Sequence, residues 1–133
     1  MQTLTLEIVK QINFDNKSVA LRSDGIALIT ITTNEDVEIK DVVEIVSALE
    51  EIGQGKKFPL LIVTQKYTLP SPEARAYIAT AESDPFASAE AYVIQSFSQK
   101  LVGNVYISFN KPARPTRIFT SEAKATEWLK TFL

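Results

Sequence analysis

The chain has 133 residues, of which 45% are hydrophobic and 23% are charged. This composition fits one compact domain, 1–133, that is long enough to bury a core without disulfides or a structural metal. With 14 basic against 16 acidic residues the formal net charge is −2, so no overall positive field favours binding to nucleic acid or to an anionic membrane.

The sequence contains no Cys and no His. Disulfides, thiolate nucleophiles, thiolate or imidazole metal ligands and a Ser-His-Asp triad are therefore excluded. An enzyme of this composition would need carboxylates or lysines with shifted pKa values, so we expect no catalytic residue, metal or cofactor. No stretch approaches the roughly 20 apolar residues of a membrane span, and no cationic start precedes an apolar segment. We expect a cytoplasmic protein.

The first third of the sequence predicts strands. Residues 3–9 alternate between apolar and polar side chains, which is the period of a half-buried strand. Two further alternating runs, 18–22 and 26–32, flank Asp24 and Gly25, a pair that favours the positive φ of a tight hairpin turn. We therefore expect an antiparallel hairpin in which Asp24 is a turn residue rather than a catalytic acid.

A helical period follows and predicts an amphipathic helix over 39–52, with apolar residues on one face and acidic residues on the other. We expect Asn34 or Asp36 to cap its start and Gly53 to end it in a left-handed conformation. The acidic stripe is interpreted as a solvated face, because a binding role would need a basic partner.

The centre of the sheet is predicted at 58–64, an unbroken apolar run of strand length. Such a run suits a strand that is covered on both faces in a parallel sheet. Pro59 is expected at the first residue of the strand, where no hydrogen bond from its nitrogen is needed. After a loop, Ser71 is the predicted N-cap of the next helix and Pro72 its first residue.

The loop between this strand and helix holds the best-placed polar residues. In open α/β sheets, strand carboxyl ends and helix N-termini converge there, and free N–H groups attract anions. We therefore select a candidate partner-binding or phosphorylation loop, although helix capping in a surface loop accounts for the same residues. Its members are Lys66, Tyr67, Thr68, Ser71 and Arg75.

A strand at 89–94 and a further helix, capped by Ser96 or Ser98, come next. Alternation over 105–109 also permits an extended end, but a helix between strands continues the upstream pattern. Five apolar side chains of this helix are expected to be buried. They are Phe97, Leu101, Val102, Val105 and Phe109.

The loop 110–115 contains two prolines and two cations, and a third cation follows it. Lys111, Arg114 and Arg117 are the candidate contacts for an anion, with a solvated, proline-stiffened loop as the alternative. A strand at 116–119 and a helix capped by Thr120 or Ser121 end the chain. Its Trp128 is expected to anchor the core.

These elements resemble the STAS or SpoIIAA-like proteins, small bacterial proteins with the fold of the anti-sigma-factor antagonists. The resemblance implies an α/β fold with a mixed β-sheet, an N-terminal β-hairpin and about four helices. It is carried by Leu60–Val63, the helix opening Pro70–Arg75, the Ala-rich Ala89–Val93, and an ending made of Lys111-Pro112, Pro115–Thr120, Ala125 and Trp128-Leu129.

The resemblance also implies a non-catalytic protein-interaction or regulatory module that binds its partner around 68–77. Antagonists of the family place an Asp-Ser or Ser-Gly phosphorylation motif where the central strand meets its helix. The segment 64–71 has neither the aspartate nor the glycine. A phosphorylation switch through Ser71 or Thr68 is thus a hypothesis that rests on the favourable placement of negative charge at a helix N-terminus.

The same fold group is similar to lipid-binding CRAL-TRIO domains. A small-molecule or lipid carrier is therefore the alternative function, with an apolar pocket that Phe97, Val105, Tyr106 and Phe109 could line. A homodimer formed through an edge strand of the opening hairpin is a further expectation.

Overall fold

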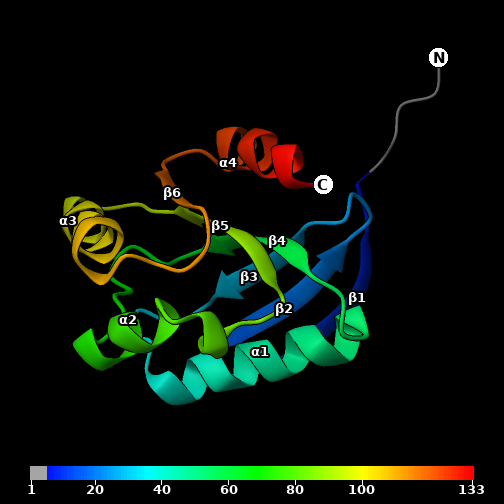
Figure 1. Ribbon diagram of the computed structural model, residues 1–133, viewed down its shortest axis with the longest axis horizontal. Coiled ribbons are helices and arrows are strands. Elements are labelled where there is room, and N and C mark those ends of the chain that lie inside the picture. The colour runs from blue at the N-terminus through cyan, green and yellow to red at the C-terminus, as the bar shows by residue number, and fades with distance from the viewer. Residues whose placement is uncertain (1–5) are drawn as a thin grey trace.

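The computed structural model describes residues 6–133 and contains one six-stranded sheet in the order β1-β2-β3-β4-β5-β6 (Figure 1). The first three strands are antiparallel, and β3 to β6 run parallel to one another. The predicted mixed α/β sheet with an N-terminal hairpin is confirmed. The strands are β1 (Ile8–Asn13), β2 (Lys17–Arg22), β3 (Ala27–Ile31), β4 (Phe58–Val63), β5 (Ala87–Val93) and β6 (Thr116–Phe119).

Helices cover both faces of the sheet, with α4 on the side opposite α1 (Figure 1). One apolar cluster joins Ile29 and Leu60 to Leu49 of α1, and a second joins Leu61 to Leu129 of α4. None of the helices within residues 6–133 is long and apolar enough to cross a membrane. The helices are α1 (Ile39–Gly53), α2 (Pro72–Ile78), α3 (Phe97–Val105) and α4 (Glu122–Leu129), with single turns η1 (Ala81–Ser83), π-helical η2 (Tyr106–Asn110) and η3 (Lys130–Phe132).

The hairpin joins β2 and β3, as the sequence predicts. The Asp24 carboxylate accepts a hydrogen bond from the Ile26 N–H at 3.2 Å, and Gly25 has a φ of 89°. The strand predicted at 3–9 lies further along the chain, because β1 begins at Ile8. It is also not half-buried as predicted, since most of its residues are exposed. The first part of that prediction, up to residue 5, lies outside the described residues.

Both predicted ends of α1 need correction. Glu38 is the N-cap rather than Asn34 or Asp36, and its N–H donates to the Asp41 carboxylate at 2.9 Å. Gln54, not Gly53, adopts the left-handed conformation, with a φ of 53°. Gly53 is required for another reason. A Cβ there would lie 2.3 Å from the Phe58 ring, so only glycine permits this close approach.

The acidic stripe of α1 is not wholly solvated. Asp41 is only 4% exposed, and its Oδ1 lies 3.2 Å from the Nζ of Lys17, which is 2% exposed. Glu44 accepts from the same ammonium group at 2.8 Å. Although burial opposes it, hydrogen bonds from the Glu38 N–H, Asn16 and Lys17 hold the pKa of Asp41 below its ordinary value. The basic partner is thus supplied within the chain, by β2.

The central strand is β4, which pairs in parallel with both β3 and β5. It ends one residue before the predicted Thr64, and Pro59 occupies its second position rather than its first. The pairing with β5 shifts register between Phe58 and Pro59. This irregularity accommodates the missing N–H of the proline.

A helix over the segment from Phe97 is confirmed, but its predicted burial is wrong. Phe97, Leu101 and Phe109 are 72%, 52% and 79% exposed, and Val105 is 43% exposed. Of the five residues expected to be buried, only Val102 lies on the face of α3 and η2 that turns toward the sheet, together with Gln99, Gly103 and Tyr106. This face turns inward because of hydrogen bonds. The Gln99 amide donates to the carbonyls of Gln65 and Thr68, and these bonds hold that side of the helix against the loop after β4.

The last elements agree with the sequence. Strand β6 occupies 116–119 as expected, and the Ser121 hydroxyl accepts the Lys124 N–H at the start of α4. Trp128 is half-buried rather than fully enclosed, with its ring centroid 4.9 Å from that of Phe132 and 5.8 Å from that of Phe119. It anchors α4 to the outer end of the sheet.

Candidate functional site

The loop after β4 contains both buried and exposed candidate residues. Thr68 is 3% exposed, and its hydroxyl donates to the Thr33 carbonyl at 2.6 Å. Ser71 is 7% exposed and caps α2 as predicted, since its hydroxyl accepts the Ala74 N–H at 3.1 Å. Both hydroxyl groups therefore have a structural role, and a kinase would reach them only after the loop had opened.

The other loop candidates lie apart from these hydroxyl groups. Tyr67 is 65% exposed, and the Lys66 ammonium lies 5.6 Å from the centre of its ring. Arg75 is half-buried on α2, where one terminal nitrogen makes a long hydrogen bond of 3.4 Å to the Pro70 carbonyl. Its Nε is buried and has no hydrogen-bond partner among residues 6–133. The structure brings Arg75, but not Lys66 or Tyr67, to an internal cavity.

The three candidate anion contacts do not converge. Arg114 is 8% exposed and points inward, where it pairs with Glu90. Arg117 is exposed on β6, with its guanidinium carbon 5.3 Å from the Phe119 ring centre and 5.6 Å from that of Trp128. Lys111 is exposed at the end of η2, in a left-handed conformation. No two of these cations share a site, and the charge of Arg114 is already compensated.

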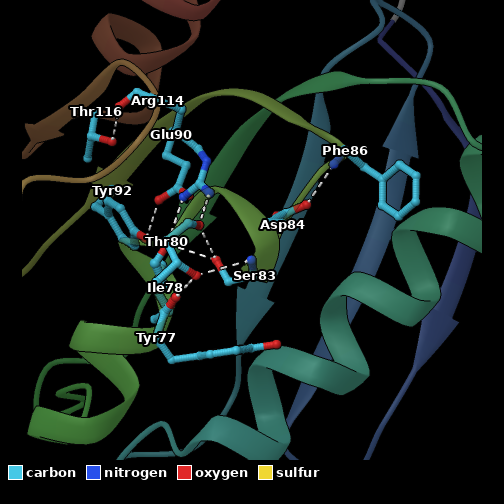
Figure 2. Close-up of polar contacts among 10 residues, drawn as sticks. All are labelled: Tyr77, Ile78, Thr80, Ser83, Asp84, Phe86, Glu90, Tyr92, Arg114 and Thr116. Carbon is cyan, nitrogen blue, oxygen red and sulfur yellow. Dashed lines mark hydrogen bonds and ion pairs between the residues drawn. The ribbon is translucent and has the colours of Figure 1, made fainter.

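A buried polar cluster surrounds Glu90 on β5 (Figure 2). Its Oε1 lies 2.6 Å from an Arg114 nitrogen, and its Oε2 accepts from the Tyr92 hydroxyl at 2.5 Å. The guanidinium also donates at 2.8 Å to the carbonyls of Ile78 and Thr80. This cluster ties the segment between α2 and η1 to the middle of the sheet.

Burial dominates the electrostatics of the cluster. It raises the pKa of Glu90 although the Arg114 charge and the Tyr92 hydroxyl act in the opposite direction. It also raises the pKa of Asp84, whose carboxylate accepts the Phe86 N–H at 3.1 Å. These two carboxylates are the groups that an enzyme without His or Cys would need. Both carboxylates already accept hydrogen bonds that stabilise the fold.

An apolar cavity of about 130 Å³ lies beside this cluster, between the sheet and the layer formed by α1, α2 and α3. Ile29, Leu60 and Ile62 contribute from the sheet, and Val46 contributes from α1. Of the four residues expected to line a pocket, only Tyr106 does so. Phe97, Val105 and Phe109 lie on the outer side of their helix and are exposed.

The outer side of α3 and η2 is a continuous run of apolar side chains, which we name the α3 apolar face. The residues recur at every fourth position, so they form one stripe along the helix. The π-helical turn of η2, closed by the Lys111 N–H on the Tyr106 carbonyl at 3.1 Å, continues the helix to the last of them. The members are Phe97, Leu101, Val105 and Phe109.

Comparison with known proteins identifies the family and the fold. The model of the family described as "Domain of unknown function (DUF7793)" matches residues 19–133. The chain belongs to the DUF7793 family. This DUF7793 chain is also similar to an uncharacterised protein of the DUF3478 family from Shewanella loihica PV-4, whose crystal structure has a SpoIIAA-like fold. The TM-score is 0.52 at 16% identity, over 97% of this chain and 98% of the other. No curated protein matches.

The structural match confirms the SpoIIAA-like fold of the DUF7793 chain, and at this identity it shows the fold alone. Sequence reasoning missed the polar cluster, although one signal was present. Glu90 stands in the otherwise small and apolar strand Ala87–Val93. A charge in a strand covered on both faces requires a buried partner, and Arg114 is the cation that the fold brings to it.

Proposed function

We propose that this protein is a non-catalytic interaction module of a regulatory kind, and that it binds a protein partner through the α3 apolar face. The observation that carries the proposal is the exposure of Phe97, Leu101 and Phe109 on one side of one helix. With about 200 Å² for a Phe side chain, the face leaves on the order of 400 Å² of apolar surface in water. A contiguous patch of that size is comparable to the largest apolar patch of a typical monomeric protein, and such patches are often functional.

The charges around this face indicate the chemistry of the partner. Residues 91–121 contain four cations and no Asp or Glu. Arg114 is buried, but Lys100 and Lys111 are exposed next to the apolar stripe. An amphipathic helical segment with acidic residues beside its apolar face would complement both features. We propose such a segment as the partner.

The edge strand β1 is a weaker surface for self-association. Ile8 and Val9 are exposed there, at 46% and 59%. However, the register of β1 shifts between Ile8 and Lys10, and the strand carries an exposed lysine. A bulge and a lysine are both devices that prevent an edge strand from pairing with another chain. This contrast supports α3 rather than β1 as the binding surface.

A non-catalytic role is supported by the state of the buried carboxylates. Glu90 is paired with Arg114 and Tyr92, and Asp84 accepts a backbone N–H. Neither carboxylate is free to exchange a proton with a substrate without losing a contact that holds the fold. The protein-interaction role therefore uses the outer surface of the module and leaves its interior intact.

The test uses a synthetic amphipathic peptide with leucines at helical spacing and flanking glutamates, titrated by fluorescence anisotropy. Leu101→Asp should weaken its binding at least tenfold, because a charge would then lie at the centre of the apolar contact. Ser98→Asp, an exposed change on the same helix, is the matched control and should weaken it far less. A peptide with lysines in place of the glutamates should bind more weakly than the acidic one.

Three results would overturn the proposal. The first is equal loss of binding in Leu101→Asp and Ser98→Asp, and the second is no binding of the acidic peptide to the folded wild type. The third is a dimer in light scattering that Leu101→Asp dissociates and Ser98→Asp does not. That result would assign the α3 apolar face to a second copy of the chain.

A further inference from the structure

The cavity between the sheet and its helices has the size of a single small ring. Its volume is about 130 Å³, and its walls are almost entirely apolar. An apolar cavity of about 150 Å³ in another protein stays dry and takes up benzene. The acyl chain of a membrane lipid is several times larger than this space. A lipid is therefore too large for this cavity. Only a molecule of roughly six to ten non-hydrogen atoms would fit.

Two polar atoms of residues in the wall have no hydrogen-bond partner among residues 6–133, the Arg75 Nε and the Tyr106 hydroxyl oxygen. Tyr106, at the start of η2, is 6% exposed, and its hydroxyl oxygen makes no hydrogen bond to any of residues 6–133. Buried hydroxyl groups are almost always hydrogen-bonded, because their transfer from water is unfavourable without a partner. The neighbouring Tyr92 ring packs edge-on at 5.9 Å between centroids, but its hydroxyl donates to Glu90 instead. The cavity thus offers a ligand the unused Tyr106 hydroxyl group on η2, besides the Arg75 Nε on α2.

The charges around Tyr106 select a neutral ligand. Burial and the nearby Glu90 charge both raise the pKa of Tyr106, so its hydroxyl stays protonated and can both donate and accept. Glu90 and Asp84 also line the cavity. The Arg114 guanidinium is paired with Glu90, and Arg75 of α2 is a second cation, in the cavity wall. The two carboxylates and the two guanidinium groups balance in charge, so a neutral ligand leaves no uncompensated charge in the cavity.

We propose that the cavity binds a small neutral aromatic molecule, about the size of phenol, with one hydroxyl or carbonyl group that hydrogen-bonds to the Tyr106 hydroxyl. This site is separate from the α3 apolar face, which lies on the other side of the same helix. Because α3 forms both the cavity wall and the partner surface, an occupied cavity would sit directly behind the proposed binding face.

The test compares phenol with benzene, which has the same ring without the hydroxyl group, by isothermal titration calorimetry. In a wholly apolar cavity, phenol binds more weakly than benzene because its hydroxyl group loses its hydration. Wild type should instead bind phenol at least as tightly as benzene. Tyr106→Phe should weaken phenol binding about three- to tenfold relative to benzene, as expected for the loss of one hydrogen bond. Tyr67→Phe, at an exposed tyrosine outside the cavity, is the matched control and should change neither affinity.

A second variant tests the place of binding. Val46→Phe puts a ring into the cavity from α1 and should abolish binding of both probes while the cooperative unfolding transition is retained. The proposal is overturned if wild type binds neither probe, if Tyr106→Phe leaves the ratio of the two affinities unchanged, or if folded Val46→Phe still binds. None of these results depends on the α3 apolar face, so they are distinguishable from failure of the partner-binding role.

Discussion

Arg114→Met is the substitution that would test the buried polar cluster most directly. Methionine keeps much of the length and apolar volume of the arginine stem, but it removes the charge and every donor. Glu90, 2% exposed, would then lose its cation. The carbonyls of Ile78 and Thr80 would also lose their 2.8 Å hydrogen bonds.

The expected loss of unfolding free energy is roughly 3–5 kcal/mol, the cost of removing one partner from a buried ion pair. The loss should depend on pH. The folded-state pKa of Glu90 is already raised by burial, and it would rise further without Arg114. A raised folded pKa contributes stability below the unfolded value, and that contribution is lost as pH rises through the folded pKa. The deficit of Arg114→Met relative to wild type should therefore shrink from neutral pH toward pH 4.

Urea unfolding followed by Trp128 fluorescence is the assay, because the single tryptophan packs between Phe119 and Phe132. With a urea dependence of about 2 kcal/mol/M, the midpoint should fall by roughly 2 M at neutral pH. Adding Glu90→Gln to Arg114→Met should recover part of the loss, since the unpaired charge disappears.

The control is Arg117→Met, which removes an exposed cation three positions away. We expect that change to cost less than about 1 kcal/mol, the value of an exposed cation–aromatic contact. A loss below about 1 kcal/mol in Arg114→Met, a deficit that does not change with pH, or a double variant less stable than Arg114→Met would refute the reasoning.

Three further predictions concern other parts of the fold. Asp41→Asn should lower the free energy of unfolding at neutral pH by roughly 1.5–3 kcal/mol, because the charged hydrogen bond to Lys17 is lost. Urea unfolding measures this difference. Because the folded pKa of Asp41 is lowered, its contribution is present above the ordinary value of 3.8 and is lost as pH falls through the folded pKa, so the difference should vanish in strong acid. Gly53→Ala should lower the melting temperature because the Phe58 ring must move, and Phe58→Leu in the same background should restore part of it. Ser71→Ala should cost about 1 kcal/mol as a lost N-cap, whereas Ser71→Asp should retain most of the stability. Equal stability of those two variants would show that the cap contributes nothing.

Local patterns in the sequence determined most of the elements and the class of fold. The Asp24-Gly25 turn, the apolar run of β4 and the Ser71-Pro72 helix start each depend on interactions within a few residues, so they could be predicted. The SpoIIAA-like order of strands and helices follows from such elements. The N-cap at Glu38 was missed because Asn34 and Asp36 are residue types that commonly cap helices, whereas Glu38 does so through its reciprocal contact with Asp41 three residues later.

The tertiary structure alone decided which face of α3 is buried. The sequence of the helix contains an apolar stripe, which predicts that this side is buried. However, Gln99 on the opposite side donates hydrogen bonds to two carbonyls of the loop after β4. The cavity and the pairing of Glu90 with Arg114 also depend on contacts between residues distant in the sequence. A periodic pattern shows that a helix has two faces, but the groups that the rest of the chain presents decide which face turns inward, and hence where this protein can bind.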